Sequence, residues 1–227
     1  MNDLDREKQL AAEAAAELVE DGMTVGLGTG STAAFAIRKI AGRVQGGLRI
    51  RALPTSRATE QLARELGIPL VDFGQVTRLD LTLDGADELD PALNLTKGGV
   101  GALFREKIVA AASARLVIFA DHTKRVARLG RFPLPVEVNP FGWQVVAEKV
   151  RALGAQVTLR EREGKTFVTD NGGHILDCRF GEIADPPALE RRLRAIVGVM
   201  ETGLFCGMAS LACVAEGDTV HHVRPVR

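Results

Sequence analysis

A segment rich in glycine and hydroxyl side chains, residues 28–32 with the sequence GTGST, offers the clearest chemistry in this chain. It follows a short apolar stretch, residues 23–28, and leads into a helical pattern over residues 32–41. Glycines let the backbone approach a ligand closely, and a helix N-terminus presents unpaired N–H groups and a favourable dipole to an anion. With the hydroxyls of Thr29, Ser31 and Thr32, this pattern favours phosphate binding over the alternative, in which Ser31 or Thr32 only caps the helix.

The loop differs from the two common nucleotide-binding loops. It is not a Walker A motif, because no lysine follows its last glycine, Gly30. Gly28, Gly30 and Ala33 match GxGxxA, but an NAD site also needs an acidic residue ~20 positions later. The sequence has no Asp or Glu between Asp21 and Glu60. NAD is therefore disfavoured, and an NADP-dependent oxidoreductase, with Arg51 or Arg57 meeting the 2′-phosphate, is a remote alternative.

Two carboxylates follow the alternating stretch of residues 79–83, in the sequence DGADE of residues 84–88. Ligands of open parallel sheets bind at the carboxyl ends of the strands. Asp84 and Asp87 are therefore candidates for acid–base chemistry or for binding hydroxyl groups. The alternative is a turn at Asp84-Gly85 with Asp87 capping a short helix.

A third candidate group combines Lys97-Gly98-Gly99 with Glu106, which lies in an apolar helical pattern over residues 100–114. A carboxyl group on such a buried face has a raised pKa, which suits a general base near neutral pH. The sequence leaves an alternative equally open, in which Glu106 forms a buried structural ion pair with Arg105 or Lys107.

Helix-like and strand-like segments alternate through the first half of the chain. Strands are expected at residues 23–28, 48–53, 68–73, 79–83 and 116–120, and helices at 4–19, 32–41, 57–66 and 100–114. This alternation predicts a Rossmann-like α/β domain, in which helices cover both faces of a parallel sheet.

The pattern changes after residue 126. The proline-punctuated FPLPVEVNP precedes a helix over 141–153, strands follow around a turn at Asn171-Gly172-Gly173, and DPPALERRLRAI begins like a helix. A last strand is expected at 199–205. This order is compatible with a small ferredoxin-like α+β domain. The tail from Gly207 is strand-like and is expected to return to the first sheet, so the predicted domains are residues 1–126 with 206–227, and residues 127–205.

Composition narrows the class of protein. Lys+Arg and Asp+Glu are 29 each, so no basic surplus favours nucleic acid. No stretch approaches the ~20 apolar residues of a membrane span, and the N-terminus lacks the apolar core of an export signal. Three cysteines, none spaced CxxC, fit reduced thiols in a cytoplasmic protein. No metal-ligand spacing occurs, and neither His122 nor the pair His221-His222 is indicated as a catalytic base or a metal site.

Together the segments resemble ribose-5-phosphate isomerases of type A. The matching stretches are, in order, VGLGTGSTA, PTSRAT, DGADE, KGG, REKI, ADHTK, LGRFPLPVEV, VTDNGGHILDC and ETGLF. The resemblance implies interconversion of D-ribose 5-phosphate and D-ribulose 5-phosphate in the non-oxidative branch of the pentose phosphate pathway. It implies no cofactor and no metal, and a homodimer or homotetramer.

The resemblance also implies roles for residues of this chain. Glu106, from the REK motif, would transfer a proton between carbons 2 and 1 through a cis-enediolate, and Lys97 would stabilise the oxyanion. Asp84 and Asp87 would bind sugar hydroxyls and assist ring opening. The residues implied to bind substrate are Lys8, Thr29, Gly30, Ser31, Thr32, Asp84, Gly85, Ala86, Asp87, Lys97, Gly98, Gly99, Val100 and Lys124. Val100 stands where members of the family often have a further glycine.

A second class of protein, a sensor of sugar phosphates, could use the same phosphate-binding loop. A non-catalytic sugar-phosphate sensor would need the GTGST loop but neither Glu106 nor Lys97, and it would adjoin a DNA-binding segment. Both residues are present and no length is spare for such a segment, which favours the isomerase.

Overall fold

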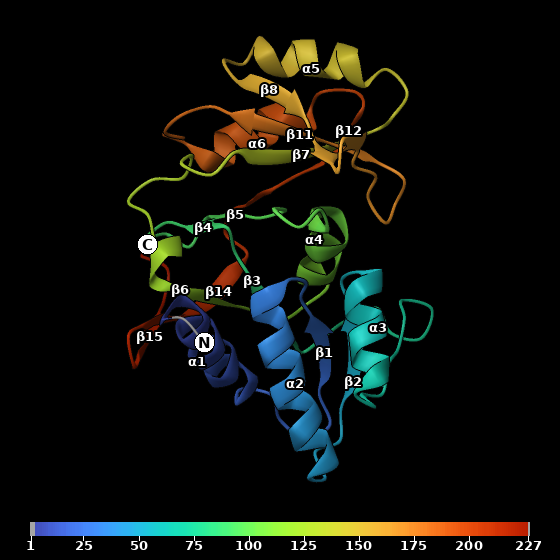
Figure 1. The fold of residues 1–227 in the computed structure, drawn as a ribbon, viewed down its shortest axis with the longest axis vertical. Helices are drawn as coiled ribbons and strands as arrows, with labels where there is room; N and C mark the ends of the chain where they lie inside the picture. Colours follow the sequence, from blue (N-terminus) through green and yellow to red (C-terminus); the bar gives the residue numbers. More distant parts are fainter. Residues whose placement is uncertain (1–2, 227) are drawn as a thin grey trace.

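The computed structural model describes residues 3–226 as two layered units, one above the other in Figure 1. The larger unit is built on a six-stranded sheet with the strand order β15-β14-β6-β3-β1-β2. Its parallel strands are β1 (Thr24–Leu27), β2 (Arg51–Pro54), β3 (Leu81–Gly85), β6 (Leu116–Asp121) and β14 (Ala209–Glu216). The edge strand β15 (Thr219–Val223) is antiparallel to β14. The predicted return of the tail to this sheet is confirmed.

Helices cover the sheet because its strands are apolar on both faces. On one face lie α1 (Asp3–Ala16), α2 (Ser31–Gln45) and α3 (Arg57–Glu65), which share a buried cluster with β1, β3 and β6 (Figure 1). On the other face α4 (Leu103–Ala111) packs so closely that a Cβ on Gly26 would lie 2.6 Å from Val109. Figure 1 shows α4 on the side of the larger unit that faces the smaller one.

The smaller unit is a four-stranded antiparallel sheet with the order β12-β7-β11-β8. Its strands are β7 (Leu134–Val138), β8 (Gln156–Leu159), β11 (His174–Arg179) and β12 (Val199–Thr202). Helices α5 (Trp143–Arg151) and α6 (Pro186–Arg194) share its hydrophobic cluster. This is the ferredoxin-like order, with β9 (Glu161–Arg162) and β10 (Lys165–Thr166) as an extra hairpin. The predicted fold class is therefore confirmed.

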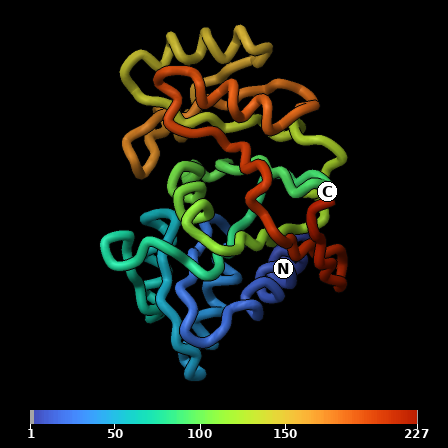
Figure 2. Tube along the Cα trace, turned by 180° about the vertical axis from the view of Figure 1, so that it is seen from behind, coloured from blue at the N-terminus to red at the C-terminus, as the bar shows by residue number. Residues whose placement is uncertain are grey.

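A short three-stranded sheet connects the two units. It consists of β4 (Glu88–Leu89), β5 (Leu95–Thr96) and β13 (Leu204–Phe205), and β13 belongs to the segment that returns from the smaller unit to the larger one (Figure 2). The backbone N–H of Lys97 donates to the carbonyl of Gly203 at 2.8 Å, so this segment also holds the start of the KGG loop. The domain boundaries at residues 126/127 and 205/206 stay a prediction.

Two local expectations are wrong in part. Residues 68–73 do not form a strand, since only Leu70 bridges to Ala52, and Pro69 has no N–H to extend the ladder. The helix expected at 100–114 spans only Leu103–Ala111, because Gly98 and Gly101 have positive φ angles of 103° and 90°. The proline-punctuated stretch contains β7, which is the strand that a ferredoxin-like unit requires before α5 and which lies between β12 and β11. Within residues 3–226, no helix is both long and apolar enough to span a bilayer.

Candidate active site

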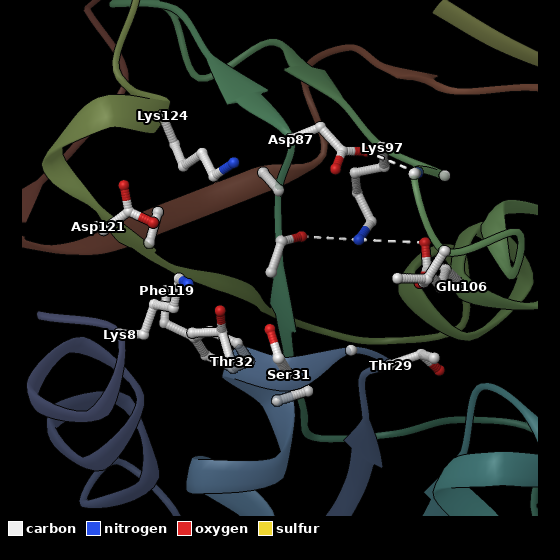
Figure 3. Close-up of a pocket in the computed structure, with 18 residues that line it drawn as sticks. Lys8, Thr29, Ser31, Thr32, Asp87, Lys97, Glu106, Phe119, Asp121 and Lys124 are labelled. Atoms are coloured by element: carbon white, nitrogen blue, oxygen red, sulfur yellow. Dashed lines mark hydrogen bonds and ion pairs between the residues drawn. The ribbon is translucent and has the colours of Figure 1, made fainter. Parts of the chain in front are cut away.

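A cavity of about 180 Å³ opens at the carboxyl ends of β1, β3 and β6, beside the start of α4 (Figure 3). It is smaller than the ~300–1,000 Å³ typical of pockets for drug-sized ligands, and most of its wall is polar, which fits a small charged molecule. Its lining residues are Lys8, Thr29, Gly30, Ser31, Thr32, Ala33, Gly85, Ala86, Asp87, Lys97, Gly98, Gly99, Val100, Glu106, Phe119, Ala120, Asp121 and Lys124.

The GTGST loop forms the floor of the cavity and leads into α2. Gly30 is the N-cap residue, with a positive φ of 123°, so the cap is a residue without a side chain rather than Ser31 or Thr32. Ser31 and Thr32 begin the helix and border the cavity, where the first N–H groups of α2 have no partner within the helix. The structure thus places two hydroxyls beside a helix N-terminus, where N–H groups and the helix dipole favour an anion.

The Thr29 hydroxyl points away from the cavity, as Figure 3 shows. Its Oγ1 lies within hydrogen-bond distance of three hydroxyls of the PTSRAT motif: 2.7 Å from Thr55 Oγ1, 2.9 Å from Ser56 Oγ and 3.1 Å from Thr59 Oγ1. Thr59 in turn donates to the carbonyl of Gly28 at 2.9 Å. Thr29 therefore contributes its backbone to the cavity, and its side chain anchors the loop.

Lys97 is the centre of the charged part of the site. Its Nζ lies 3.0 Å from Oδ2 of Asp84 and 3.2 Å from Oε2 of Glu106, and it donates to the carbonyl of Gly85 at 2.7 Å. Only 3% of the residue is exposed. Burial by itself lowers the pKa of Lys97, but Asp84 and Glu106 more than offset this effect, so the pKa is raised and the ammonium stays charged.

Glu106 extends from α4 toward this ammonium group and is 1% exposed. Burial, together with the negative charge of Asp84, raises its pKa to about 8, although Lys97 acts in the opposite direction. The structure does not show the alternative in which Glu106 forms an ion pair with its neighbours Arg105 or Lys107. Lys107 pairs with Glu190 and Glu201, while Arg105 donates to Asn171.

Asp84 and Asp87 have different positions. Asp84 lies behind the cavity wall, where its Oδ1 accepts N–H bonds from Gly85 at 2.8 Å and Thr29 at 3.3 Å. A Cβ on Gly28 would lie 2.2 Å from this carboxylate, so the close approach of β1 and β3 requires glycine there. Asp87 faces the cavity and accepts the N–H of Gly99 at 2.8 Å, and burial raises its pKa. Neither aspartate caps a helix.

The KGG loop forms the wall opposite α2. A Cβ on Gly99 would lie 2.5 Å from the Asp87 carboxylate, so any larger residue there would displace that side chain. Val100 is 46% exposed and lines the cavity beside Gly30. Its side chain is accommodated without crowding, since a Cβ on Gly30 would be 3.8 Å from it.

Lys8 and Lys124 lie on the side of the cavity away from Glu106 (Figure 3). They come from distant elements, α1 and the 3-10 helix η1 (His122–Lys124). The buried Glu7 holds these elements together, because its Oε2 is 2.6 Å from Nδ1 of His122 and its Oε1 accepts the N–H of Gly217 at 2.9 Å. His122 is thus a partner of Glu7 at the edge of the site. Lys8 is also paired with Asp5 at 3.2 Å.

Four lining residues were not among the predicted site residues: Ala33, Phe119, Ala120 and Asp121. Phe119 and Asp121 belong to β6, and Asp121 ends that strand as Asp84 nearly ends β3. The buried Asp121 accepts the N–H of Thr123 at 3.1 Å, which fixes η1 and therefore Lys124. The strand-end rule that selected Asp84 could have selected Asp121. Within residues 3–226, no cluster of three or more His, Cys, Asp or Glu side chains could hold a metal ion.

Comparisons with known proteins agree on one family. The model of the family ribose 5-phosphate isomerase A (phosphoriboisomerase A) matches residues 51–219. A ribose-5-phosphate isomerase A of Gloeobacter violaceus is 55% identical over 225 residues, covering 98% of each chain. Another, from Sphingopyxis alaskensis, is 50% identical and covers 97% of this chain and 96% of its own.

Solved structures resemble the whole fold. Ribose 5-phosphate isomerase A from Neisseria gonorrhoeae has 37% sequence identity and a TM-score of 0.92, covering 99% of this chain and 98% of its own. A D-ribose-5-phosphate isomerase in complex with phospho-erythronic acid has 37% identity and a TM-score of 0.95, covering 99% of this chain and all of its own.

Proposed function

The chain belongs to the ribose 5-phosphate isomerase A family, aldose–ketose isomerases of ribose 5-phosphate and ribulose 5-phosphate, and we propose that it acts through a cis-enediolate with Glu106 as the base. The observation that carries this proposal is the buried Lys97–Glu106 pair at 3.2 Å on the wall of a small polar cavity. A carboxyl group with a raised pKa beside a fixed cation suits proton abstraction next to a carbonyl group.

The distribution of charge suggests how the sugar phosphate lies. Lys8 and Lys124 lie on one side of the cavity and Lys97 with Glu106 on the other, with Ser31 and Thr32 below (Figure 3). We place the phosphate between the two lysines and the N-terminus of α2, and carbons 1 and 2 beside Glu106. The backbone of residues 29–30, 85–86 and 98–100 then borders the sugar.

The proton transfers follow from this orientation. The Glu106 carboxylate takes the proton from carbon 2 of the open-chain aldose, and the electron pair moves to O1, which becomes the enediolate oxyanion. The Lys97 ammonium stabilises this charge. Glu106 returns its proton to carbon 1, while the hydroxyl proton moves from O2 to O1. Asp87 faces the cavity and binds a sugar hydroxyl, and Asp84 acts from behind by holding Lys97.

A relative's ligand is consistent with this proposal. The solved isomerase with a TM-score of 0.95 to this chain is in complex with phospho-erythronic acid. Such a molecule combines a planar carboxylate with a phosphate, the same two charged features that a phosphorylated enediolate carries. The homo-oligomeric state, the cytoplasmic location and the absence of a cofactor stay predictions.

Isomerisation in heavy water tests the reaction. We expect purified protein with ribose 5-phosphate, EDTA and no nucleotide to form ribulose 5-phosphate that carries solvent deuterium at carbon 1, measured by NMR. Exchange of the abstracted proton with solvent is the mark of an enediolate route. Ketose without any label would contradict an exchanging base. Saturable binding without turnover would instead favour the sugar-phosphate sensor.

The phosphate position can be tested with a second substrate. Ser31→Ala combined with Thr32→Val removes both hydroxyls at the start of α2, and we expect KM for ribose 5-phosphate to rise about tenfold, the effect of one or two lost hydrogen bonds to a charged group. The comparison is D-ribose, which lacks the phosphate and should react equally slowly with both proteins. Equal KM values for ribose 5-phosphate would contradict the position.

A further inference from the structure

One peptide of the KGG loop is held from two sides. The carbonyl of Gly98 accepts a hydrogen bond from Nη1 of Arg160 at 2.7 Å, and the N–H of Gly99, which belongs to the same peptide, donates to Asp87 at 2.8 Å. The C=O and N–H of a trans peptide point in opposite directions. Arg160 and Asp87 therefore fix the plane of this peptide together.

The following peptide is oriented by the same guanidinium group. Nη1 of Arg160 also donates to the carbonyl of Gly99 at 3.2 Å. The N–H of Val100 then points away from Arg160. Gly99 and Val100 line the cavity, whereas Arg160 lies in a separate groove on the outer side of the loop. The direction away from Arg160 is thus the direction toward the substrate.

Arg160 is itself rigidly held by the smaller unit. It follows β8, its backbone N–H donates to Ile175 at 2.8 Å, and its side chain is 12% exposed. Asp177 of the neighbouring strand β11 takes both ends of the guanidinium fork, with Nε at 2.9 Å from Oδ2 and Nη2 paired with Oδ1. Such a bidentate pair fixes geometry better than a single contact.

We propose that Arg160 is a positioning residue for substrate binding, which acts from the smaller unit by aiming the N–H of Val100 at the cavity and by keeping the N–H of Gly99 on Asp87. The proposal rests on the isomerase function proposed above. The positive charge of Arg160 also polarises the Gly98–Gly99 and Gly99–Val100 peptides, which strengthens their N–H groups as donors. Because Lys97 is held separately by Gly203, the proton-transfer pair does not depend on Arg160. Loss of Arg160 should therefore act on KM much more than on kcat.

The test compares Arg160→Met, Arg160→Lys and a control. We expect KM for ribose 5-phosphate to rise about tenfold in Arg160→Met with kcat within about threefold of the natural protein, and Arg160→Lys to lie between, since one ammonium reaches a carbonyl without the fork. The control is Arg162→Met, an arginine of the same groove that stacks on Phe167 at 4.5 Å and should leave KM unchanged. A purely structural role would lower the amount of active enzyme and leave KM unchanged, which would overturn the proposal.

A double variant excludes an indirect cause. Arg160→Met leaves Asp177 without its partner, so Arg160→Met/Asp177→Asn restores the charge balance and protects folding. The double variant should keep the raised KM, and a return to the natural KM would overturn the proposal. Calorimetric titration with ribose 5-phosphate, brought to equilibrium with ribulose 5-phosphate, gives an apparent Kd and the same comparison independently of the reaction rate. If the natural protein bound ribose 5-phosphate without converting it, the isomerase proposal would be refuted. The role of Arg160 would still be tested by comparing the Kd of the natural protein with that of Arg160→Met.

Discussion

Replacement of Glu106 by glutamine should lower kcat by about 10²–10⁴-fold, the usual contribution of a general base. Glutamine keeps the size of the side chain and a polar oxygen for Lys97, but its amide cannot accept the proton from carbon 2. KM should change little, because binding depends on the N-terminus of α2, on Lys8 and Lys124, and on the KGG loop. The measurement is steady-state kinetics in both directions. Near-normal turnover in a folded Glu106→Gln protein would contradict the assigned base.

The free energy of unfolding of Glu106→Gln, measured against pH, distinguishes loss of the base from misfolding of the variant. The pKa of Glu106 is about 8 in the folded protein against an ordinary 4.5. Between these values the unfolded chain loses the proton and the folded chain keeps it, so the free energy of unfolding falls as the pH rises, by up to about 1.4 kcal/mol per unit. Glu106→Gln removes this loss. Denaturant titrations from pH 5 to 8 should show the variant gaining stability relative to the natural protein.

A second buried glutamate provides a matched control. Glu137 of β7 is fully buried, and burial raises its pKa as it does for Glu106. It accepts hydrogen bonds from Thr169 at 2.6 Å and Asn171 at 3.3 Å and lies outside the cavity wall. Glu137→Gln should therefore leave kcat nearly unchanged. An equal loss of activity in both variants would mean that any buried carboxyl change disturbs the fold.

Replacement of Lys97 by methionine should lower kcat by about 10³-fold or more, for two reasons. The enediolate oxyanion loses its cation, which alone is worth about 10²–10³-fold when such a group is removed. The pKa of Glu106 also rises further, since Lys97 lowers it in the natural protein, so less of the base is ionised at neutral pH. Kinetics across pH 6.5–9.5 should show both a lower maximum and an alkaline shift of the rising limb.

Folding controls accompany this variant. Without Lys97 the buried Asp84 lacks a counter-charge, which costs about 3–5 kcal/mol when one partner of a buried pair is removed. Lys97→Met/Asp84→Asn should regain stability but not activity. Lys107→Met is the matched control, because Lys107 is also buried and its Nζ lies 4.8 Å from the Phe205 ring, against 5.3 Å for Lys97. Lys107 pairs outside the cavity, so its loss should reduce stability and spare kcat. Full activity of Lys97→Met would refute the oxyanion role.

Features that depend on local spacing could be predicted from the sequence. The strand–loop–helix at GTGST and the carboxylates after β3 each belong to one short segment. The sequence of that segment therefore predicts both the chemistry of the side chains and their position at a strand end. The ion-pair partner of Glu106 could not be predicted from local spacing. Arg105 and Lys107 are its chain neighbours, but successive helical residues point about 100° apart, and the partner comes from a loop that only tertiary packing brings near.

The remaining gaps have similar causes. Arg160 looks like one exposed arginine among several in the sequence, and only the pairing of β8 with β11 shows that Asp177 aims it at the KGG loop. Pro135 lies within β7, which pairs on both sides, although proline is usually confined to edge strands. Asp121, at the end of β6, was predictable by the strand-end rule, which was applied to the carboxylates Asp84 and Asp87 after β3.

The hold of Gly203 on Lys97 has a consequence for the order of events during synthesis. The GTGST loop, Asp84, Asp87, Lys97 and Glu106 leave the ribosome early. Gly203, which holds Lys97, and β13, which pairs with β5, emerge nearly half a chain later. At about 5–20 residues per second this delay is roughly 5–20 s. The parallel pairing of β14 with β6 must wait for the same interval. A growing chain therefore carries every reacting group of the site well before it can catalyse, and activity begins only when the last strands arrive.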